Sequence, residues 1–344
     1  MTLACPTPHH DRETLLLGHG AGGRLSAELL HDLVLPAFGA PPDSVLEDAA
    51  LLPGDSELAL STDAFVVDPL VFPGGDIGCL AVHGTVNDLA MRGALPVALS
   101  LAVIAEEGLP LDELRTALES AGKAARDVGV PVLTGDTKVV GRGAADRLFL
   151  TTTGVGRRIP GLTPSVTRAR PGDAILLSGP IGLHGTTILS TREGLGFEAG
   201  IASDTRPLHR LVSALAGCGE AVHTLRDPTR GGLAAALNEI ARDARIGVTI
   251  EERALPVPEV VGAACDLLGL DPLVVANEGC MVAFVAPDAA DAALDALRAL
   301  PEGAEAVRLG TAVEGTPGRV ELRTLVGAGR IVEMPMGEQL PRIC

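Results

Sequence analysis

The chain of 344 residues carries a formal net charge of −17 and contains 2% aromatic residues, with no Trp and no Tyr. Such a charge repels nucleic acid and anionic membranes, and the scarcity of aromatic rings excludes base-stacking platforms. No apolar run approaches the roughly 20 residues of a membrane span, and the N-terminus lacks the apolar segment of a signal peptide. We therefore expect a cytoplasmic protein with no nucleic-acid or membrane partner.

The first half of the chain reads as an α+β unit. A glycine-rich loop at 18–23 precedes a helix, and residues 58–67 form a strand that contains an aspartate. Asp76 can cap a helix that runs to Met91, and a strand follows at 98–105. A helix opens at Asp112 and ends at Gly129, and strands at 130–140 and 148–155 complete the unit.

The pattern restarts after residue 160. We expect helices at 184–192, 208–216, 232–242, 258–268 and 289–300, and strands at 174–177, 248–251, 273–276, 281–285 and 307–313, with a final hairpin at 320–326 and 330–333. The strands do not alternate strictly with helices, which argues against a doubly wound sheet. The sequence thus predicts a two-domain α+β fold of mixed sheets flanked by helices: an extension at 1–13, domains at 14–160 and 161–333, and a mobile tail at 334–344.

Two features of the first half could bind a nucleotide and its metal. The loop around Gly20, Gly22 and Gly23 lets backbone N–H groups converge on a phosphate, although a flexible turn explains it equally well. The other feature is a set of four aspartates beside small neighbours, which suits the hard oxygen ligands of Mg²⁺, although each one alone reads as a cap or turn. The four are Asp48, Asp63, Asp88 and Asp136.

Three further segments carry charged groups that could act on a phosphate or a reacting atom. Lys138 follows Gly135-Asp136-Thr137 at a strand end, and the alternative is a surface lysine. Arg230 lies in a run, 227–232, that leads into a helix and could bind anions, or simply cap that helix. Glu278 stands between two apolar strands, where it is either a general base or part of a hairpin turn.

The C-terminus ends in a cysteine. Two prolines, a glycine and no periodicity in 334–344 predict a mobile arm, and Cys344 at its end can carry a reactive group between sites. Arg342 favours the nucleophilic thiolate, and the terminal carboxylate opposes it. An accidental terminal thiol is the alternative interpretation.

Together these segments resemble the HypE family of hydrogenase maturation factors, from about Leu16 to Cys344. The resemblance rests on STD at 61–63, VVDP at 66–69, FPGGDIG at 72–78, GTVNDLA at 84–90, GDTKVV at 135–140, DPTRGG at 227–232, ANEG at 276–279 and the ending PRIC. The ending separates this family from its relatives in the PurM-like superfamily, which include aminoimidazole ribonucleotide (AIR) synthetase, selenophosphate synthetase and thiamine-monophosphate kinase.

The resemblance implies a homodimer of PurM-like, AIR synthase-like chains, with ATP between the two domains and Mg²⁺ on aspartates. Carried onto this chain, Asp48, Asp63, Asp88 and Asp136 become the metal candidates. The nucleotide contacts become Gly20, Gly22, Gly23, Asp63, Asn87, Asp88, Asp136, Thr137 and Arg230. Where the family has paired aspartates this chain has Glu47-Asp48, which puts the role of Glu47 as a ligand in doubt.

The implied reaction is the ATP-dependent dehydration of a carbamoyl group on Cys344 to a thiocyanate. The carbamoyltransferase HypF would load the cysteine, Lys138 would stabilise charge, Glu278 would act as the base, and the cyanide would pass to iron on a HypC–HypD scaffold. Two other functions stay open: a small-molecule kinase or synthetase of the same superfamily, and a non-catalytic scaffold with a docking tail.

Overall fold

The structure is a computed structural model that describes residues 15–20, 22–39, 41, 44–52, 55–195, 200–337 and 342–344. The expected N-terminal extension at 1–13 lies outside the described residues, and so do Ala21 of the glycine loop and residues 338–341 of the tail. Among the described residues, no helix combines the length and apolarity that a membrane crossing requires.

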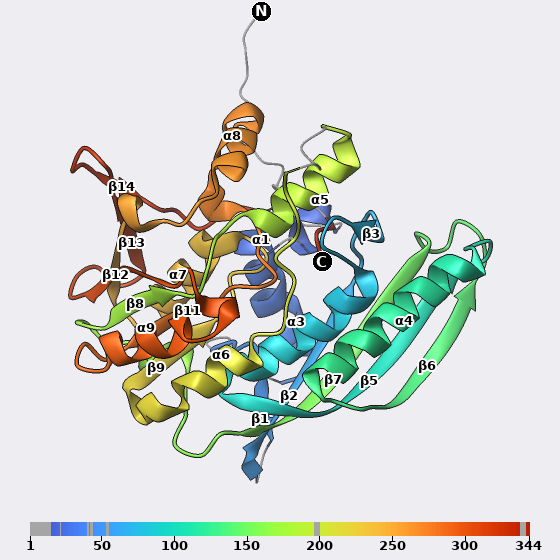
Figure 1. Ribbon diagram of the computed structural model, residues 1–344, viewed down its shortest axis with the longest axis horizontal. Coiled ribbons are helices and arrows are strands. Elements are labelled where there is room, and N and C mark those ends of the chain that lie inside the picture. Colours follow the sequence, from blue (N-terminus) through green and yellow to red (C-terminus); the bar gives the residue numbers. More distant parts are fainter. Residues whose placement is uncertain are drawn as a thin grey trace, which may run out of the picture.

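The first sheet has five strands in the order β1-β2-β7-β5-β6, and only the β5–β6 pair is parallel. Its strands are β1 (Ala50–Leu52), β2 (Asp55–Phe65), β5 (Ala94–Glu106), β6 (Val132–Val140) and β7 (Leu148–Arg158). Helices α3 (Ile77–Met91) and α4 (Leu111–Val128) lie along one face of it (Figure 1). Short elements surround this unit: α1 (Gly23–Leu29), η2 (Leu30–Val34), α2 (Leu35–Ala37), β3 (Val71–Phe72) and β4 (Gly75–Asp76).

The ends of the two long helices are those that the sequence predicts. The Asp76 carboxylate accepts from the backbone N–H groups of Gly78 and Cys79 at 2.7 and 3.0 Å, which caps α3. Gly129 ends α4 in the left-handed conformation with a φ of 80°. Both cap predictions are confirmed.

The second sheet has seven strands in the order β14-β13-β10-β12-β8-β11-β9. They are β8 (Ala174–Leu177), β9 (Val222–Arg226), β10 (Gly247–Glu251), β11 (Val282–Val285), β12 (Val307–Val313), β13 (Arg319–Arg323) and β14 (Gly329–Ile331). The helices of this half are α5 (Leu183–Glu193), α6 (His209–Ala214), α7 (Gly232–Asp243), α8 (Glu259–Leu268) and α9 (Ala290–Arg298). The sheets of both halves are mixed, and the α+β fold class is as expected.

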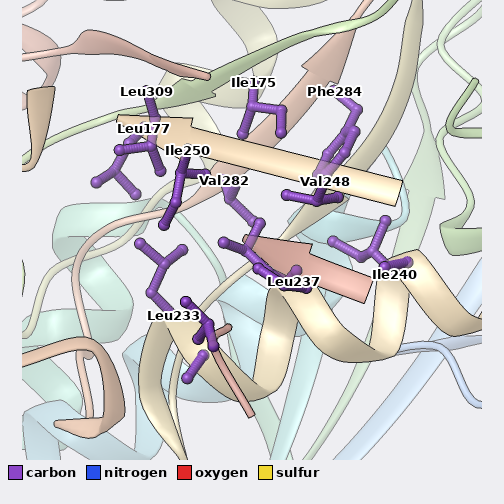
Figure 2. Close-up of a cluster of buried hydrophobic side chains, with 14 of the residues drawn as sticks. Ile175, Leu177, Leu233, Leu237, Ile240, Val248, Ile250, Val282, Phe284 and Leu309 are labelled. Atoms are coloured by element: carbon purple, nitrogen blue, oxygen red, sulfur yellow. The ribbon is translucent and has the colours of Figure 1, made fainter. Parts of the chain in front are cut away.

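Helices cover both faces of the centre of the second sheet, which explains why β8 is buried along its whole length. Ile175 and Leu177 of β8 point toward α7 and pack with Leu237 and Ile240 (Figure 2). Leu176, between them in the strand, faces the opposite way and packs with α6 and α9. The two cores contain few aromatic rings, as the composition requires.

One strand prediction in this half is wrong and one strand was missed. Residues 272–274 form a short 3₁₀ helix, η7, instead of the expected strand at 273–276. Pro272 occupies its first turn, and the Asp271 side chain accepts from the N–H of Leu273 at 3.0 Å, so the local caps outweigh the apolar run. The missed strand, β9, is an edge strand that leads directly to Asp227.

Candidate active site between the two domains

Acidic side chains from both halves of the chain meet in one buried cluster. Asp63 lies on β2, on the face that α3 covers, and Asp88 lies on α3, where its carboxylate accepts from the Ser61 hydroxyl at 2.6 Å. Asp48 precedes β1, and Asp227 directly follows β9 of the second sheet. Three of the four predicted aspartates are therefore brought together, and Asp227 joins them from the other domain.

Burial gives these acids unusually high proton affinity. Desolvation raises the pKa of Asp48 to about 8, although Arg226 opposes the change. Desolvation also raises the pKa of Asp88 well above its ordinary value, with added repulsion from Asp227, Asp48 and Asp63. Asp227, Asp48 and Asp63 all disfavour the ionised form of Asp88, so a cation bound beside these carboxylates would be stabilised.

Two arginines of the second domain complete the cluster. Arg226 pairs with Asp48 at 3.1 Å and with Glu239 at 2.7 Å. Arg230 donates to the carbonyl oxygen of Gly20 at 2.9 Å and also faces Asp63. Arg230 is therefore placed between the glycine loop and the acids, as a phosphate-binding arginine requires.

The glycine loop packs closely against Arg230 and the C-terminal segment. A Cβ on Gly22 would lie 2.8 Å from the Cβ of Arg230, and one on Gly23 would lie 2.4 Å from the carbonyl oxygen of Pro335. Both glycines have positive φ angles, 78° and 71°. Only glycine can be accommodated where two backbones approach so closely, so both glycines are required for the packing of this loop against the site.

Glu278 enters the same cluster from a loop of the second domain. Its backbone N–H and that of Gly279 donate to the carboxylate of Asp204, at 3.1 and 2.9 Å. Burial raises the pKa of Glu278 well above its usual range, and Asp227 adds to this effect. A buried carboxyl with high proton affinity is suited to take a proton from a substrate once a cation or Arg230 stabilises its ionised form.

Asn87 is fully engaged with the protein backbone. Its amide nitrogen donates to the carbonyl oxygens of Arg206 and Glu278, at 3.1 and 3.4 Å, and its Oδ1 accepts from the N–H of Leu208 at 2.8 Å. In this structure Asn87 therefore ties α3 to the second domain, and its expected contact with a nucleotide stays a prediction.

The C-terminal cysteine lies in the site. The nearby Cys344 is the largest cause of a raised pKa at Arg230. Burial raises the pKa of the Cys344 thiol to about 12, and Glu278 and Asp63 add to the rise. The C-terminus lies near α5 and β3 (Figure 1), where the Ile343 carbonyl accepts from His184 and Ile343 packs with Phe72. The structure thus describes the tail in a docked position with a neutral thiol, and its mobility stays a prediction.

Asp136, Thr137 and Lys138 are not near these groups within one chain. They lie on β6, the edge strand of the first sheet, where Lys138 pairs with Asp136 at 2.7 Å and their side chains are 67% and 63% exposed. The sequence predicted one site for all the acidic candidates, and a single chain does not assemble it. The sequence could not reveal this, because the face on which a strand residue lies depends on its register with the next strand.

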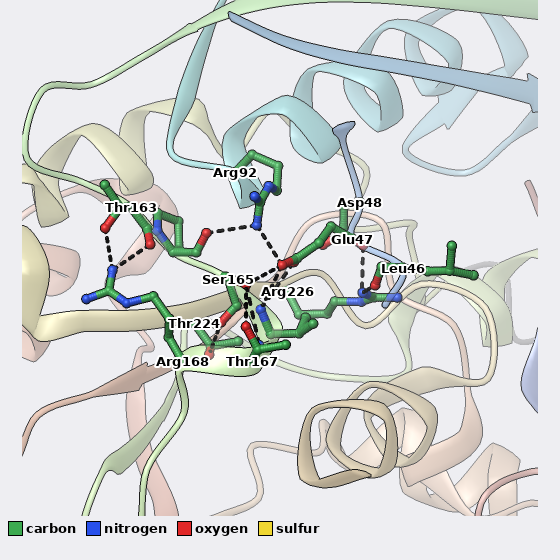
Figure 3. A network of polar contacts seen from close by, with 12 residues as sticks. Leu46, Glu47, Asp48, Arg92, Thr163, Ser165, Thr167, Arg168, Thr224 and Arg226 are labelled. Atoms are coloured by element: carbon green, nitrogen blue, oxygen red, sulfur yellow. Dashed lines mark hydrogen bonds and ion pairs between the residues drawn. The ribbon is translucent and has the colours of Figure 1, made fainter. Parts of the chain in front are cut away.

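Glu47 has a structural position instead of a ligand position. It pairs with Arg92 at 2.8 Å, accepts from the Ser165 hydroxyl, and accepts from the N–H of Val166 at 3.2 Å (Figure 3). These contacts join the start of the first domain to the connector between the domains. Because its carboxylate is engaged by Arg92, Ser165 and Val166, these contacts argue against a role of Glu47 as a metal ligand.

The sequence also gave no indication of several residues that shape the site. Asp204 and His184 lie in segments without a recognisable motif, and Arg226 ends the strand β9, which was not predicted from the sequence. Asp227 was part of a noted motif, and a buried aspartate after a strand was a usable signal for the acidic cluster.

Comparison with known proteins agrees with this geometry. Residues 46–158 match the N-terminal domain of AIR synthase related proteins, and residues 170–323 match their C-terminal domain. The carbamoyl dehydratase HypE of Azotobacter vinelandii is 52% identical over 329 residues, which cover 95% of this chain and 96% of that protein.

Two solved structures match almost the whole chain. A crystal structure of HypE in complex with ATP is 50% identical, covers 96% of this chain and all of that one, and has a TM-score of 0.81. A HypE–HypF complex is 44% identical, covers 89% of this chain and 99% of that one, and has a TM-score of 0.86.

The two sheets and the acidic site between them define a two-domain protein of the AIR synthase-related, PurM-like class. Within that class, the identity over nearly the full length is decisive. The chain belongs to the HypE family of carbamoyl dehydratases.

Proposed function

We propose that Cys344 carries the reacting carbamoyl group and that the interdomain cluster binds the ATP that activates it. The chain is an ATP-dependent carbamoyl dehydratase of hydrogenase maturation by its family. The observation that supports the roles of its own residues is the position of Cys344, beside Arg230, Glu278 and Asp63. A role as carrier of the reacting group accounts for a terminal cysteine at this position.

The dehydration is hard without activation because the carbonyl oxygen of the thiocarbamate is a poor leaving group. Transfer of the γ-phosphoryl group of ATP to this oxygen makes it a good one. Both protons leave the nitrogen, one as the oxygen is phosphorylated and the second, taken by a base, as the oxygen departs with the phosphate. The products are the thiocyanate on Cys344, ADP, hydrogen phosphate and a proton, so every atom is accounted for.

The side chains divide these tasks by their chemistry. Arg230 holds negative charge near the tail, because its guanidinium reaches both the glycine loop and the acids. Glu278 is our candidate for the base that removes the nitrogen proton. Lys138 is our candidate for stabilising charge during phosphoryl transfer, and it reaches a site only if a second chain brings it there.

Among the described residues no three His, Cys, Asp or Glu side chains are placed to hold a metal ion by themselves, so we propose that the acidic cluster binds magnesium together with the nucleotide. Within the part of the chain that the structure describes, Asp48 Oδ2 is buried and has no hydrogen-bond partner, and the Ser61 hydroxyl donates to Asp88 against the repulsion of Asp227, Asp48 and Asp63. Asp48, Asp63 and Asp88 would hold the ion together with phosphate oxygens, which is how proteins usually bind Mg²⁺. When bound, the ion neutralises the charge of the triphosphate.

We infer that a second copy of the chain covers the open face of the first sheet. Leu60, Leu95 and Ile104 lie on the face opposite α3 and are 36%, 37% and 39% exposed. Apolar side chains on an uncovered sheet face are typical of a subunit interface. Asp136 and Lys138 lie on this same face, so a homodimer would carry them toward the partner.

The partners follow from the chemistry of the tail. HypF is proposed to load Cys344 with the carbamoyl group, and a HypE–HypF complex is among the related structures. A HypC–HypD scaffold is proposed to receive the cyanide. The cytoplasm is the proposed location, because ATP is available there and the five described cysteines are all free thiols.

The alternative, a small-molecule kinase or synthetase of the same superfamily, is not favoured. It explains the acids and the glycine loop, but it leaves the docked cysteine without a role.

Mass spectrometry of the tail peptide tests the proposal. After incubation with HypF, carbamoyl phosphate and ATP, we expect a gain of about 43 Da on Cys344, followed by a loss of about 18 Da only when ATP and Mg²⁺ are present. Cys344→Ala should abolish both shifts, whereas Lys138→Ala and Glu278→Gln should abolish only the second. Unchanged modification in Cys344→Ala would contradict the proposal.

A further inference from the structure

The backbone oxygens of the last three residues all accept hydrogen bonds from donors elsewhere in the chain. The Arg342 oxygen accepts from Arg192 Nη2 at 2.8 Å and from the N–H of Asp68 at 3.3 Å. The Ile343 oxygen accepts from His184 Nε2 at 2.9 Å, and the Cys344 oxygen accepts from the N–H of Val66 at 2.9 Å. Because three successive backbone oxygens are each hydrogen-bonded by different donors, the last three residues occupy a specific binding site, which we call the dock.

Side-chain contacts add to this dock. Ile343 is 6% exposed and packs in the core of the first domain, and Arg342 donates to the carbonyl oxygen of Val66 at 3.1 Å and pairs with Asp146. The tail is therefore bound through its side chains as well as its backbone.

His184 is the one imidazole in this dock, and its hydrogen bonds determine its tautomer. The side chain is fully buried at the start of α5, edge-on to the ring of Phe72. Burial lowers its pKa to about 4, so the ring is neutral and carries one N–H. The carbonyl oxygen of Ile343 can only accept, so the single ring proton is on Nε2 and is donated to Ile343. The unprotonated Nδ1 then accepts from the Ser203 hydroxyl, whose Oγ lies 2.7 Å away and also accepts from the N–H of Thr205 at 3.1 Å.

The segment that orients His184 also positions Glu278. The N–H of Ser203 donates to the carbonyl oxygen of Pro73 at 2.9 Å, and the next residue, Asp204, holds the backbone of Glu278 and Gly279. Segment 203–204 thus connects the dock of the tail with the loop of the candidate base.

We propose that His184, oriented by Ser203, is a positioning residue that latches the C-terminal tail in the site and so sets how much of the time Cys344 is available to the enzyme that loads it. The inference rests on the proposed role of Cys344 as the carrier. Release is needed because the docked Cys344 side chain is only partly exposed, beside Arg230 and Glu278, whereas a loading enzyme needs full access to its sulfur.

The rate at which iodoacetamide alkylates each cysteine of the full chain, followed by mass spectrometry at pH 8, tests the latch. Alkylation of Cys344 reports the released fraction of the tail. Loss of one hydrogen bond should speed it about fivefold in His184→Ala and by a smaller factor in Ser203→Ala. His184→Gln should restore most of the protection, because its amide N–H can reach the Ile343 oxygen. Cys218, which is partly exposed, should react at the same rate in every variant.

Every result of the alkylation experiment either supports or overturns the latch. Equal rates at Cys344 in His184→Ala and the unaltered chain, with the fully buried Cys280 still protected, would overturn the latch. If Cys280 also reacts, His184→Ala has lost its fold, and Ser203→Ala decides instead: an unchanged rate at Cys344 overturns the proposal. This measurement needs no ATP or HypF. Suppose that Cys344 is protected from alkylation in the unaltered chain but its tail peptide never loses about 18 Da in the dehydration assay. The proposed function would then be refuted and the latch would not.

Discussion

Asp63 and Lys138 lie on opposite faces of one five-stranded sheet. Asp63 is in register with Thr152, Leu101 and Gly135, whereas Lys138 is in register with Ile104 and Phe149, which point the other way. Side chains of successive strand residues alternate between the faces, so no local adjustment brings the two groups together within one chain. If both serve one reaction, Lys138 has to come from a second copy.

A mixing experiment tests whether the site is shared. Chains with Lys138→Ala and chains with Glu278→Gln are each expected to lack dehydration. If one copy supplies Lys138 and the other supplies Glu278, mixed dimers contain one intact site, and a statistical mixture recovers about one quarter of the sites of the unaltered protein. The recovered fraction is measured as loss of water from the carbamoylated tail peptide. No recovery after subunit exchange, verified by differently tagged chains, would mean that the site is not shared.

Asp88→Asn is expected to stabilise the chain and to abolish binding of magnesium and ATP. The folded-state pKa of Asp88 is raised, so the folded chain retains a proton that the unfolded chain loses above its ordinary pKa. Stability from this group is therefore fully present at low pH and lost as the pH rises through the folded-state pKa. Asparagine removes the ionisation and still accepts from Ser61.

The melting temperature checks this at two pH values. The difference between Asp88→Asn and the unaltered chain should be larger at pH 8 than at pH 5, whereas the exposed control Asp112→Asn should show no such change. A lower melting temperature of Asp88→Asn at pH 8 would contradict the argument.

The sequence predicted those features that depend on local chemistry. The cap at Asp76, the end of α4 at Gly129, and the strand that carries Asp63 each follow from a few neighbouring residues. The faces of Asp136 and Lys138 did not follow, because they depend on the register between β5 and β6. The docked tail could not be predicted either, because its donors at Val66 and His184 lie far away along the chain.

Gly279→Ala is expected to abolish dehydration while leaving carbamoylation of Cys344 intact. A Cβ at this position would lie 1.8 Å from the carbonyl oxygen of Asp204 and 2.9 Å from Arg206 Cγ. The backbone of segment 204–206 has to move, and the hydrogen bonds that hold Glu278 are lost with it. Mass spectrometry of the tail peptide should then show the gain of about 43 Da and no loss of about 18 Da.

Gly217→Ala is the matched control, because its Cβ would meet no atom within 4 Å. It should dehydrate at the unaltered rate. Normal dehydration by Gly279→Ala would show that the position of Glu278 does not matter to the reaction.

Glu47→Gln is expected to destabilise the chain without weakening its affinity for ATP. The glutamine can still accept from Ser165, but it leaves Arg92 without a counter-ion, and the two side chains are only 16% and 11% exposed. Breaking such a partly buried pair should lower the free energy of unfolding by about 2 kcal/mol. The exposed pair of Glu57 and Arg157 provides the control, and Glu57→Gln should cost less than about 0.5 kcal/mol. Denaturant titration gives the stabilities, and calorimetry gives the affinity for ATP with magnesium. A large loss of that affinity in Glu47→Gln, at unchanged stability, would assign Glu47 to the metal site instead of the contact between the domains.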